Sequence, residues 1–242
     1  MEKIDVFIHI PKAAGSSIRS LIEANYPPKL RVPCYRKQGV ELHGIFEQHR
    51  NTRLKDCAVV FGHIPVVVHN YTDRHCNYFT FLRDPVARAI SEYKFIKHDL
   101  PSHPAHEAFS SGKVSFSAYC AATTTGEFYF SAVSKATQLL AGVDRVKGCD
   151  DAMLEKAKRT LMNMGYFGFF HDFVVAVEEC AAYLGWNTEG YEMRNVSSVS
   201  NTDFLAREGA TERDIEVLRN TLRHDIELFD FALSTKEKRR QH

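Results

Sequence analysis

Short apolar runs alternate with amphipathic stretches along this chain, and the alternation predicts strands that are followed by helices. Residues 6–10 form an apolar run that stops at Pro11. Helical spacing of apolar residues begins at Ile18 and ends where Tyr26 meets Pro27, because proline cannot continue a helix. Buried parallel strands read as continuous apolar runs, and three more runs fit this description: 57–64, 77–82 and 166–170.

End signals in the sequence predict where the helices between these strands begin and stop. Asp84 is suited to cap a helix that starts at Pro85 and runs to about Lys97. Thr211 and Asp214 resemble an acidic capping box that opens the last helix. The other predicted helices are 16–25, 151–164, 172–184 with Asp172 as its cap and Gly185 as its end, and the last helix through 215–229.

The remaining stretches lack a clear period and are predicted as connections. They are 29–56 with one short helix near 39–50, an exposed loop at 98–113, a mixed stretch at 114–142 ending in a helix before Gly142, a polar loop at 187–202, and a frayed basic tail at 234–242. Strands alternate with helices along the chain, and no repeat or long linker divides it. We therefore predict one α/β domain over 1–242, a P-loop-like three-layer fold with a mainly parallel central sheet flanked by helices.

Composition narrows the classes of partner. The 242 residues carry a net charge of +1, which gives no general attraction to nucleic acid or membrane, so any affinity for anions must be local. No apolar run approaches the ~20 residues of a membrane span, and the first residues lack the layout of a signal peptide, so we expect a cytoplasmic protein. The six cysteines form no Cys-x-x-Cys pair and are expected to be reduced thiols.

The turn after the first strand has the chemistry of an anion site. Lys12 supplies a charge, Gly15 lets the backbone approach a ligand, and Ser16 and Ser17 supply hydroxyls at the start of a helix. The order differs from the nucleotide triphosphatase loop, in which the lysine follows the second glycine. Here Lys12 precedes Gly15, the one glycine of the turn.

Further polar residues follow two other strands. Arg83 ends the strand at 77–82, and Ser91 lies two turns into the next helix, so the unit offers a second anion site. His63 follows the strand at 57–64 in Gly-His-Ile-Pro, at the strand end where ligands of open α/β sheets bind. Two anion sites would suit a nucleotide that carries phosphates at both ends.

These motifs resemble those of the sulfotransferases that use 3′-phosphoadenosine 5′-phosphosulfate, PAPS. Phe-Ile-His-Ile-Pro-Lys-Ala-Ala-Gly-Ser-Ser resembles their 5′-phosphosulfate loop, and Phe-Leu-Arg-Asp-Pro-Val-Ala-Arg-Ala-Ile-Ser resembles their 3′-phosphate motif. The form of both is closest to the carbohydrate branch, which includes heparan sulfate 2-O-sulfotransferases and bacterial relatives. Weaker similarity continues through 138–142, 166–173 and 225–232, although His171 stands where the family usually has Glu.

The resemblance implies transfer of a sulfuryl group from PAPS to a hydroxyl, without a metal, leaving 3′,5′-adenosine bisphosphate. The acceptor would be a saccharide, with a small-molecule or lipid hydroxyl as the alternative. Lys12 would neutralise the leaving phosphate and His63 would act as general base. The residues expected to bind PAPS are Lys12, Ala13, Ala14, Gly15, Ser16, Ser17, Ile18, Arg83, Arg88, Ser91, Asn195 and Ser198.

Other interpretations remain open from the sequence. The chain could be a bisphosphate-binding module without catalysis, or a P-loop kinase of unusual sequence, although the lysine position argues against the kinase. An arginine such as Arg88 is more often part of a solvated or structural ion pair, and the alternative for the loop at 195–200 is a plain surface loop. His9 is expected to be structural, and the histidines between His98 and His106 have no spacing typical of a metal site.

Overall fold

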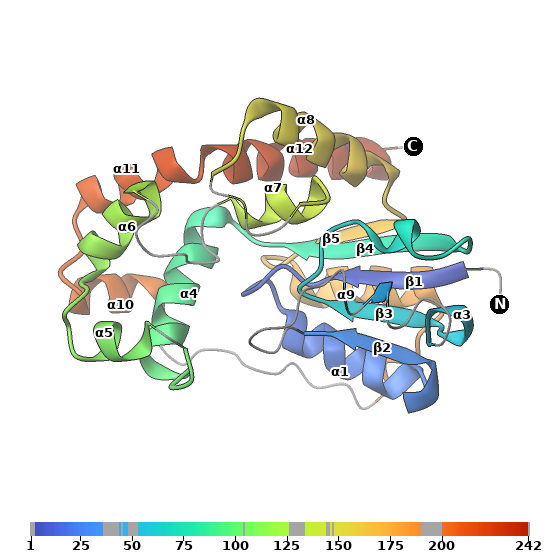
Figure 1. Cartoon of the computed structure of the whole chain (residues 1–242). Coiled ribbons are helices and arrows are strands. Elements are labelled where there is room, and N and C mark those ends of the chain that lie inside the picture. The colour runs from blue at the N-terminus through green and yellow to red at the C-terminus, as the bar shows by residue number, and fades with distance from the viewer. Residues whose placement is uncertain are drawn as a thin grey trace.

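A five-stranded sheet with all strands parallel forms the centre of the molecule (Figure 1). The computed structural model describes residues 3–35, 44, 46–47, 53–103, 105–125, 134–143, 146, 148–189 and 200–241. The strands lie in the order β2 (Arg31–Cys34), β3 (Val59–Gly62), β1 (Lys3–Ile8), β4 (His75–Leu82) and β5 (Tyr166–Phe169). The prediction of an α/β fold with a parallel sheet between helices is confirmed.

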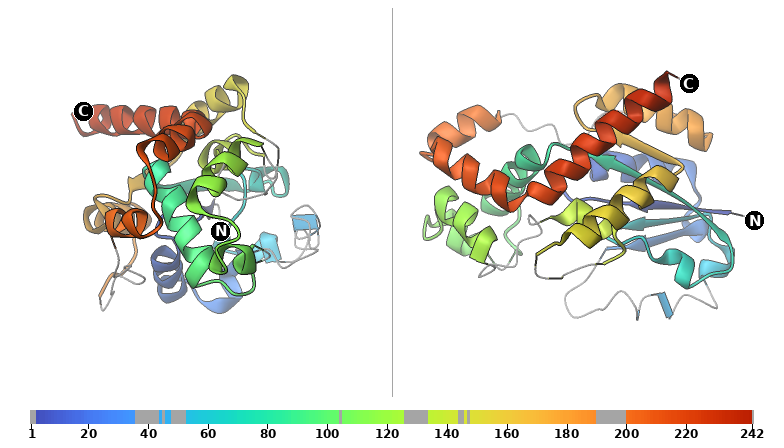
Figure 2. Two further views of the ribbon diagram at one scale, coloured as in Figure 1. Left: turned by 90° about the vertical axis from the view of Figure 1, so that its left-hand side faces the viewer. Right: turned by 90° about the horizontal axis from the view of Figure 1, so that it is seen from above.

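Helices cover both faces of this sheet (Figures 1 and 2). On one face, Phe7, Phe61 and Phe79 pack against α1 (Gly15–Asn25) and α9 (Phe173–Leu184). On the other face, the alternate residues of the strands, such as Val6 and Val60, share a core with α7, α8 and α12. Those helices span Lys135–Leu140, Asp151–Asn163 and Arg223–Arg240. Strand residues alternate between two buried faces, which explains why the strands read as continuous apolar runs.

A second group of helices lies beyond the carboxyl ends of the strands (Figure 1). Its centre is the fully buried Tyr93 of α4, whose ring contacts Phe109, Phe116, Tyr119 and Phe204. We call this group the helical lobe. Its helices are α4 (Pro85–His98), α5 (His106–Ser110), α6 (Phe116–Thr125), α10 (Asn201–Arg207) and α11 (Glu212–Thr221). Because α4 leaves β4 and enters this lobe, the carboxyl edge of the sheet faces a second packed body.

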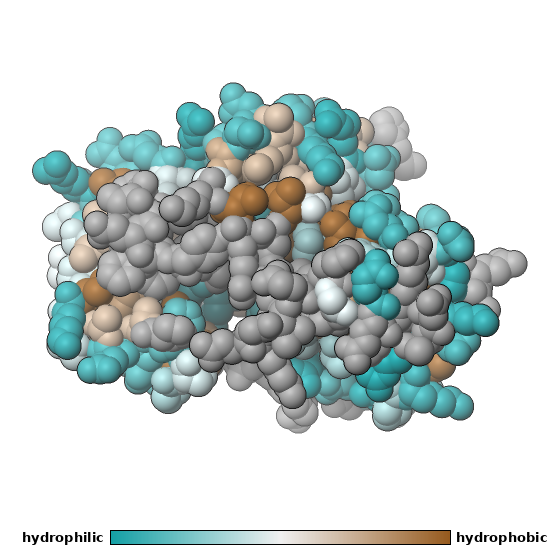
Figure 3. All heavy atoms as spheres, in the orientation of Figure 1, coloured by the Kyte–Doolittle hydropathy of each residue, from teal (hydrophilic) through white to brown (hydrophobic). Residues whose placement is uncertain are grey.

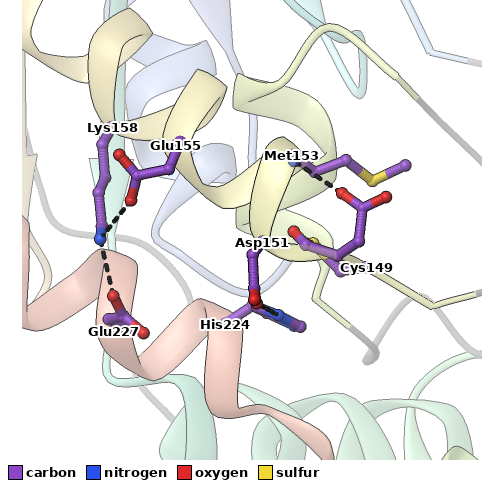
Figure 4. A network of polar contacts seen from close by, with 8 residues as sticks. Cys149, Asp151, Met153, Glu155, Lys158, His224 and Glu227 are labelled. Carbon is purple, nitrogen blue, oxygen red and sulfur yellow. Dashed lines mark hydrogen bonds and ion pairs between the residues drawn. The ribbon is translucent and has the colours of Figure 1, made fainter.

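Polar contacts join α8 to α12 (Figure 4). His224 lies 3.0 Å from Asp151, and Lys158 bridges Glu155 and Glu227 at 2.9 and 2.7 Å. Figure 3 shows hydrophilic side chains mixed with more apolar ones over the outer surface of α8. In the described part of the chain, no helix is long and apolar enough to cross a membrane.

Several connections that the sequence leaves unstructured contain short elements. Residues 31–34 form the edge strand β2, which can contain Pro33 because an edge strand need not donate on both sides. The expected loop at 98–113 contains α5, the mixed stretch holds α6, and the expected loop at 187–202 ends in the start of α10. The helix expected before Gly142 is confirmed as α7. These helices are short, so they carry little periodic signal. The predicted helix near 39–50 lies largely outside the described residues.

Two predictions near helix ends are wrong, and a third is confirmed only in position. The last helix is two helices, because Leu222 leaves helical geometry at φ −92° and ψ 13° while the apolar spacing continues across the break. The tail is not frayed: α12 continues to Arg240, and Lys236 pairs with Glu179 at 2.6 Å. Asp172 is the N-cap residue of α9, as predicted, but its side chain makes no capping hydrogen bond. The predicted capping box of Thr211 and Asp214, the Asp84 cap and the six free cysteines are confirmed.

Candidate functional site

Three aromatic rings stand in one row at the carboxyl edge of the sheet. In the strand register Cys34 pairs with Gly62, and Gly62 pairs with Ile8. Tyr35, His63 and His9 each follow one of these residues, so they lie at the same level on neighbouring strands. The ring of His9 lies 4.3 Å from that of His63, and the ring of Tyr35 lies 5.2 Å from His63. The sheet therefore brings the predicted base next to a second histidine.

The turn between β1 and α1 adopts an unusual backbone. Lys12 and Ala14 have φ values of 65° and 61°, in the left-handed region that costs a non-glycine residue about 1–3 kcal/mol. Strain of this kind persists where the surroundings impose it, and it clusters at ligand sites. Among the described residues, no acceptor receives the N–H groups of Ala14 and Gly15 at the start of α1. The turn thus presents open donors at a helix N-terminus, which suits an anion.

The two predicted anion motifs meet in space. Arg83 Nη1 donates a hydrogen bond to the carbonyl oxygen of Lys12 at 3.1 Å. The guanidinium of Arg83 also lies 4.4 Å from the centre of the Phe170 ring. This contact joins the turn after β1 to the end of β4, so both cationic side chains belong to one site.

Lys12 and Arg83 carry their charges in poorly solvated surroundings. Burial, together with Arg83 and Lys94 nearby, lowers the pKa of Lys12 to about 8, although Glu92 and Asp99 act in the other direction. Burial and the neighbouring Arg88 lower the pKa of Arg83 to about 10, against the opposing effect of Asp84. Within the described residues neither cation forms an ion pair with a carboxylate. A site that holds excess buried positive charge fits an anionic ligand.

Helix α4 completes this side of the site. The ammonium of Lys12 lies 3.7 Å from the centre of the Phe95 ring. Ser91 precedes Phe95 by four residues on α4, so the two side chains share a helix face. Arg88 is 1% exposed and lies 3.2 Å from Glu92, and in this arrangement it is a buried structural ion pair.

His9 is packed on several sides. Its Nδ1 lies 3.0 Å from the hydroxyl of Tyr35, and its ring stacks on Phe7. A Cβ atom on Gly15 would lie 1.6 Å from His9 Nε2. Gly15 is therefore required by the imidazole behind the turn, a reason that the sequence did not reveal. Burial lowers the pKa of His9 well below its usual value, assisted by His63, Lys12 and Arg19.

The other residues predicted to bind PAPS in the turn after β1 differ in whether their side chains are buried or exposed. Ala13 and Ile18 are buried, and the N–H groups of Ser17 and Ile18 donate to the carbonyl of Ala14. Ser17 is 2% exposed, whereas Ser16 lies on the surface. Asn195 and Ser198 lie outside the described residues. Only backbone donors and Ser16 therefore reach outward from this part of the turn.

Sequence reasoning missed four neighbours of the site: Tyr35, Lys94, Phe95 and Phe170. Phe95 could have been found from the sequence, because it lies four residues after Ser91 and therefore on the same helix face. Phe170 follows β5 as Arg83 follows β4, but the pairing of those strands had to be known first. Tyr35 follows a strand that the sequence did not predict.

Comparison with known proteins finds a likeness in structure alone. No family model matches the sequence, and no curated protein matches it. A solved structure, that of mouse sulfotransferase SULT7A1 complexed with PAP, is similar over 98% of this chain and 89% of that chain. The identity is 14% and the TM-score is 0.51. The chain thus has the α/β fold of a sulfotransferase.

Proposed function

We propose that this protein is a sulfotransferase that uses PAPS as donor and a hydroxyl, on a saccharide, as acceptor. The observation that carries the proposal is the contact between the two anion motifs, in which Arg83 donates to the carbonyl of Lys12 at 3.1 Å. The fold likeness to a PAP-bound sulfotransferase supports it. A nucleotide with phosphate at both ends would place negative charge beside both cations.

PAPS supplies an activated sulfuryl group, whose bond to the 5′-phosphate breaks as a bond to the acceptor oxygen forms. Lys12 would stabilise the negative charge left on that phosphate. Backbone N–H groups of Ala14 and Gly15 would bind the phosphate at the start of α1. Arg83 and Ser91 would bind the 3′-phosphate, because both lie on the β4–α4 unit. Arg88, in its ion pair with Glu92, would hold α4 rather than touch the nucleotide.

His63 would take the proton of the acceptor hydroxyl. It is half-buried at the end of β3, in the same edge as Lys12, which suits a base that must reach both solvent and donor. A positioned general base contributes about 10²- to 10⁴-fold to a rate. The motif resemblance supports a saccharide acceptor, and a small-molecule or lipid hydroxyl is the alternative. Location in the cytoplasm and action without a metal stay predictions.

Calorimetric titration with 3′,5′-adenosine bisphosphate tests the nucleotide site. We expect a dissociation constant below about 100 µM, and weaker binding of 5′-AMP, which lacks the phosphate assigned to Arg83 and Ser91. Arg83→Gln should reduce the preference for the bisphosphate. Equal affinity for both nucleotides, or no binding, would contradict the proposal.

Transfer itself is tested with labelled PAPS and a panel of saccharide, small-molecule and lipid hydroxyls. His63→Ala should lower kcat by about 10²-fold or more while the affinity for the bisphosphate is kept. Binding without transfer to any acceptor would favour a module that lacks catalysis. Phosphorylation from ATP without PAPS would favour the kinase alternative.

A further inference from the structure

We propose that His9 is a positioning residue for His63, held in place by the hydroxyl of Tyr35 and by the close packing of Gly15. The proposal rests on the proposed function, in which His63 is the base. It assigns a role to two residues, His9 and Tyr35, that the binding motifs leave without one.

The strand register is the first support. His9, His63 and Tyr35 follow residues that are paired in register on three adjacent strands. The backbone ladder continues to His9, whose N–H donates to the carbonyl of Gly62 at 2.9 Å. The chain on both sides of the two histidines is therefore fixed, and their side chains project to the face covered by α1.

The contacts of the rings are the second support. His9 and His63 lie 4.3 Å apart at an interplanar angle of 62°, and Tyr35 meets both rings edge to face. The Tyr35 hydroxyl lies 3.0 Å from His9 Nδ1, which fixes the rotation of the His9 ring. The Cα of Gly15 closes the opposite side of that ring, at Nε2. His9 thus cannot turn without moving Tyr35 or the phosphate loop, and it forms a rigid wall for His63.

The protonation state of His9 is the third support for a positioning role. The titratable and charged groups facing His9 are His63, Tyr35, Lys12 and Arg19. Burial, then His63, Lys12 and Arg19, lower the pKa of His9 well below its ordinary value. His9 is therefore a neutral ring beside the base, and a proton taken from the acceptor stays on His63.

Tyr35→Phe is the sharpest test, because it removes one hydroxyl and keeps the ring. We expect kcat for sulfuryl transfer to fall on the order of tenfold, with KM for PAPS and the affinity for the bisphosphate unchanged. His9→Asn should lower kcat further. The matched control is Tyr26→Phe, the same substitution at the other end of the sheet, where the hydroxyl donates to Asp5. Tyr26→Phe should leave kcat unchanged.

NMR of the histidine rings provides a readout that needs neither ligand nor turnover. In the free protein, Tyr35→Phe should shift the Nδ1 resonance of His9 and change the titration midpoint of His63, whereas Tyr26→Phe should change neither. Thermal melting checks that the variants are folded. An unchanged His63 titration in both Tyr35→Phe and His9→Asn, or normal kcat in both, would overturn the proposal. Absence of bisphosphate binding by the wild type would instead overturn the proposed function, and the NMR result would still decide the relation between His9 and His63.

Discussion

The two ends of the central sheet differ in whether their buried polar groups have partners within the protein. At the amino end, Asp5 accepts hydrogen bonds from Tyr26 at 2.7 Å and from Asn77 at 2.6 Å. The hydroxyl of Tyr183 donates to the amide oxygen of Asn77 at 2.7 Å. The indole N–H of Trp186 donates to the hydroxyl of Tyr26. Each buried group is matched by another part of the protein, so this end contributes to stability.

At the carboxyl end the cations are not matched in this way. Lys12 and Arg83 each contact an aromatic ring, Arg83 also donates to the backbone carbonyl of Lys12, and burial lowers the pKa of both. Two N–H groups at the start of α1 have no acceptor among the described residues. One end of the sheet is thus satisfied within the protein. The other end holds buried positive charge and open donors, which bind the nucleotide in the function we propose.

Replacing one lysine at each end of the sheet with methionine should give the largest difference between the two ends in activity. Lys12→Met should lower kcat for sulfuryl transfer by about 10²- to 10³-fold, because the charge on the leaving phosphate loses its stabilisation. Its stability should be kept or increase, because a poorly solvated charge is removed. Steady-state kinetics and chemical unfolding measure the two effects.

Lys3→Met is the control for that exchange. Lys3 is exposed and lies 3.6 Å from Asp5, so its loss should change neither kcat nor stability by much. Equal activity of Lys12→Met and Lys3→Met would remove Lys12 from the proposed mechanism.

Asp5→Ala should give the reverse result at the amino end. The substitution leaves the Tyr26 hydroxyl and the Asn77 amide without their acceptor, at a cost of about 2–4 kcal/mol in the free energy of unfolding. Affinity for the bisphosphate should be unchanged at a temperature where the variant is folded. Asp230→Ala, at an exposed site on α12, is the control for loss of an aspartate. A parallel loss of nucleotide affinity in Asp5→Ala would show that the two ends are coupled.

The sequence predicted four of the five strands that the structure describes, because the apolar run of a strand is a local signal. The apolar runs of β1, β3 and β4 are long enough to identify. Arg83 directly follows β4, and Lys12 lies in the turn after β1. A role that depends on a distant neighbour has no such local signal. Nothing near Arg88 in the sequence distinguishes a buried ion pair from a ligand contact, and its burial follows from packing against the helical lobe.

The row formed by His9, His63 and Tyr35 also depends on neighbours that are distant in the sequence. His9 was expected to be structural, but its place beside His63 depends on the pairing of β1 with β3. Tyr35 was unpredictable because β2 has four residues and contains Pro33, which weakens the signal of a strand. Register between strands is a property of the folded sheet, and one sequence carries little information about it.

Alanine substitution of one glycine at each end of the sheet tests the same difference with a smaller expected effect. A Cβ on Gly15 would meet His9 Nε2 at 1.6 Å, and a Cβ on Gly165 would meet the Tyr183 hydroxyl at 2.1 Å. Each alanine substitution should cost about 1–3 kcal/mol in stability from overpacking. Gly15→Ala should also weaken bisphosphate binding and lower kcat, whereas folded Gly165→Ala should keep both. Loss of activity in Gly165→Ala, measured well below its melting temperature, would contradict this division.

Proton uptake on binding is the smallest effect, and it depends on Lys12 alone at moderate pH. Its pKa of about 8 in the free protein lies below the ordinary lysine value of ~10.4, and a bound anion favours the charged form. At about pH 9 the bisphosphate should therefore bind with uptake of a proton, and its affinity should fall as the pH rises above about 8. Because the unfolded chain holds this proton up to a higher pH, the same group makes the free protein more stable as the pH rises from about 8 to 10. Calorimetry in two buffers of different ionisation enthalpy measures the uptake, which Lys12→Met should abolish and Lys3→Met should keep. Uptake that persists in Lys12→Met would place the titrating charge on another residue of the site.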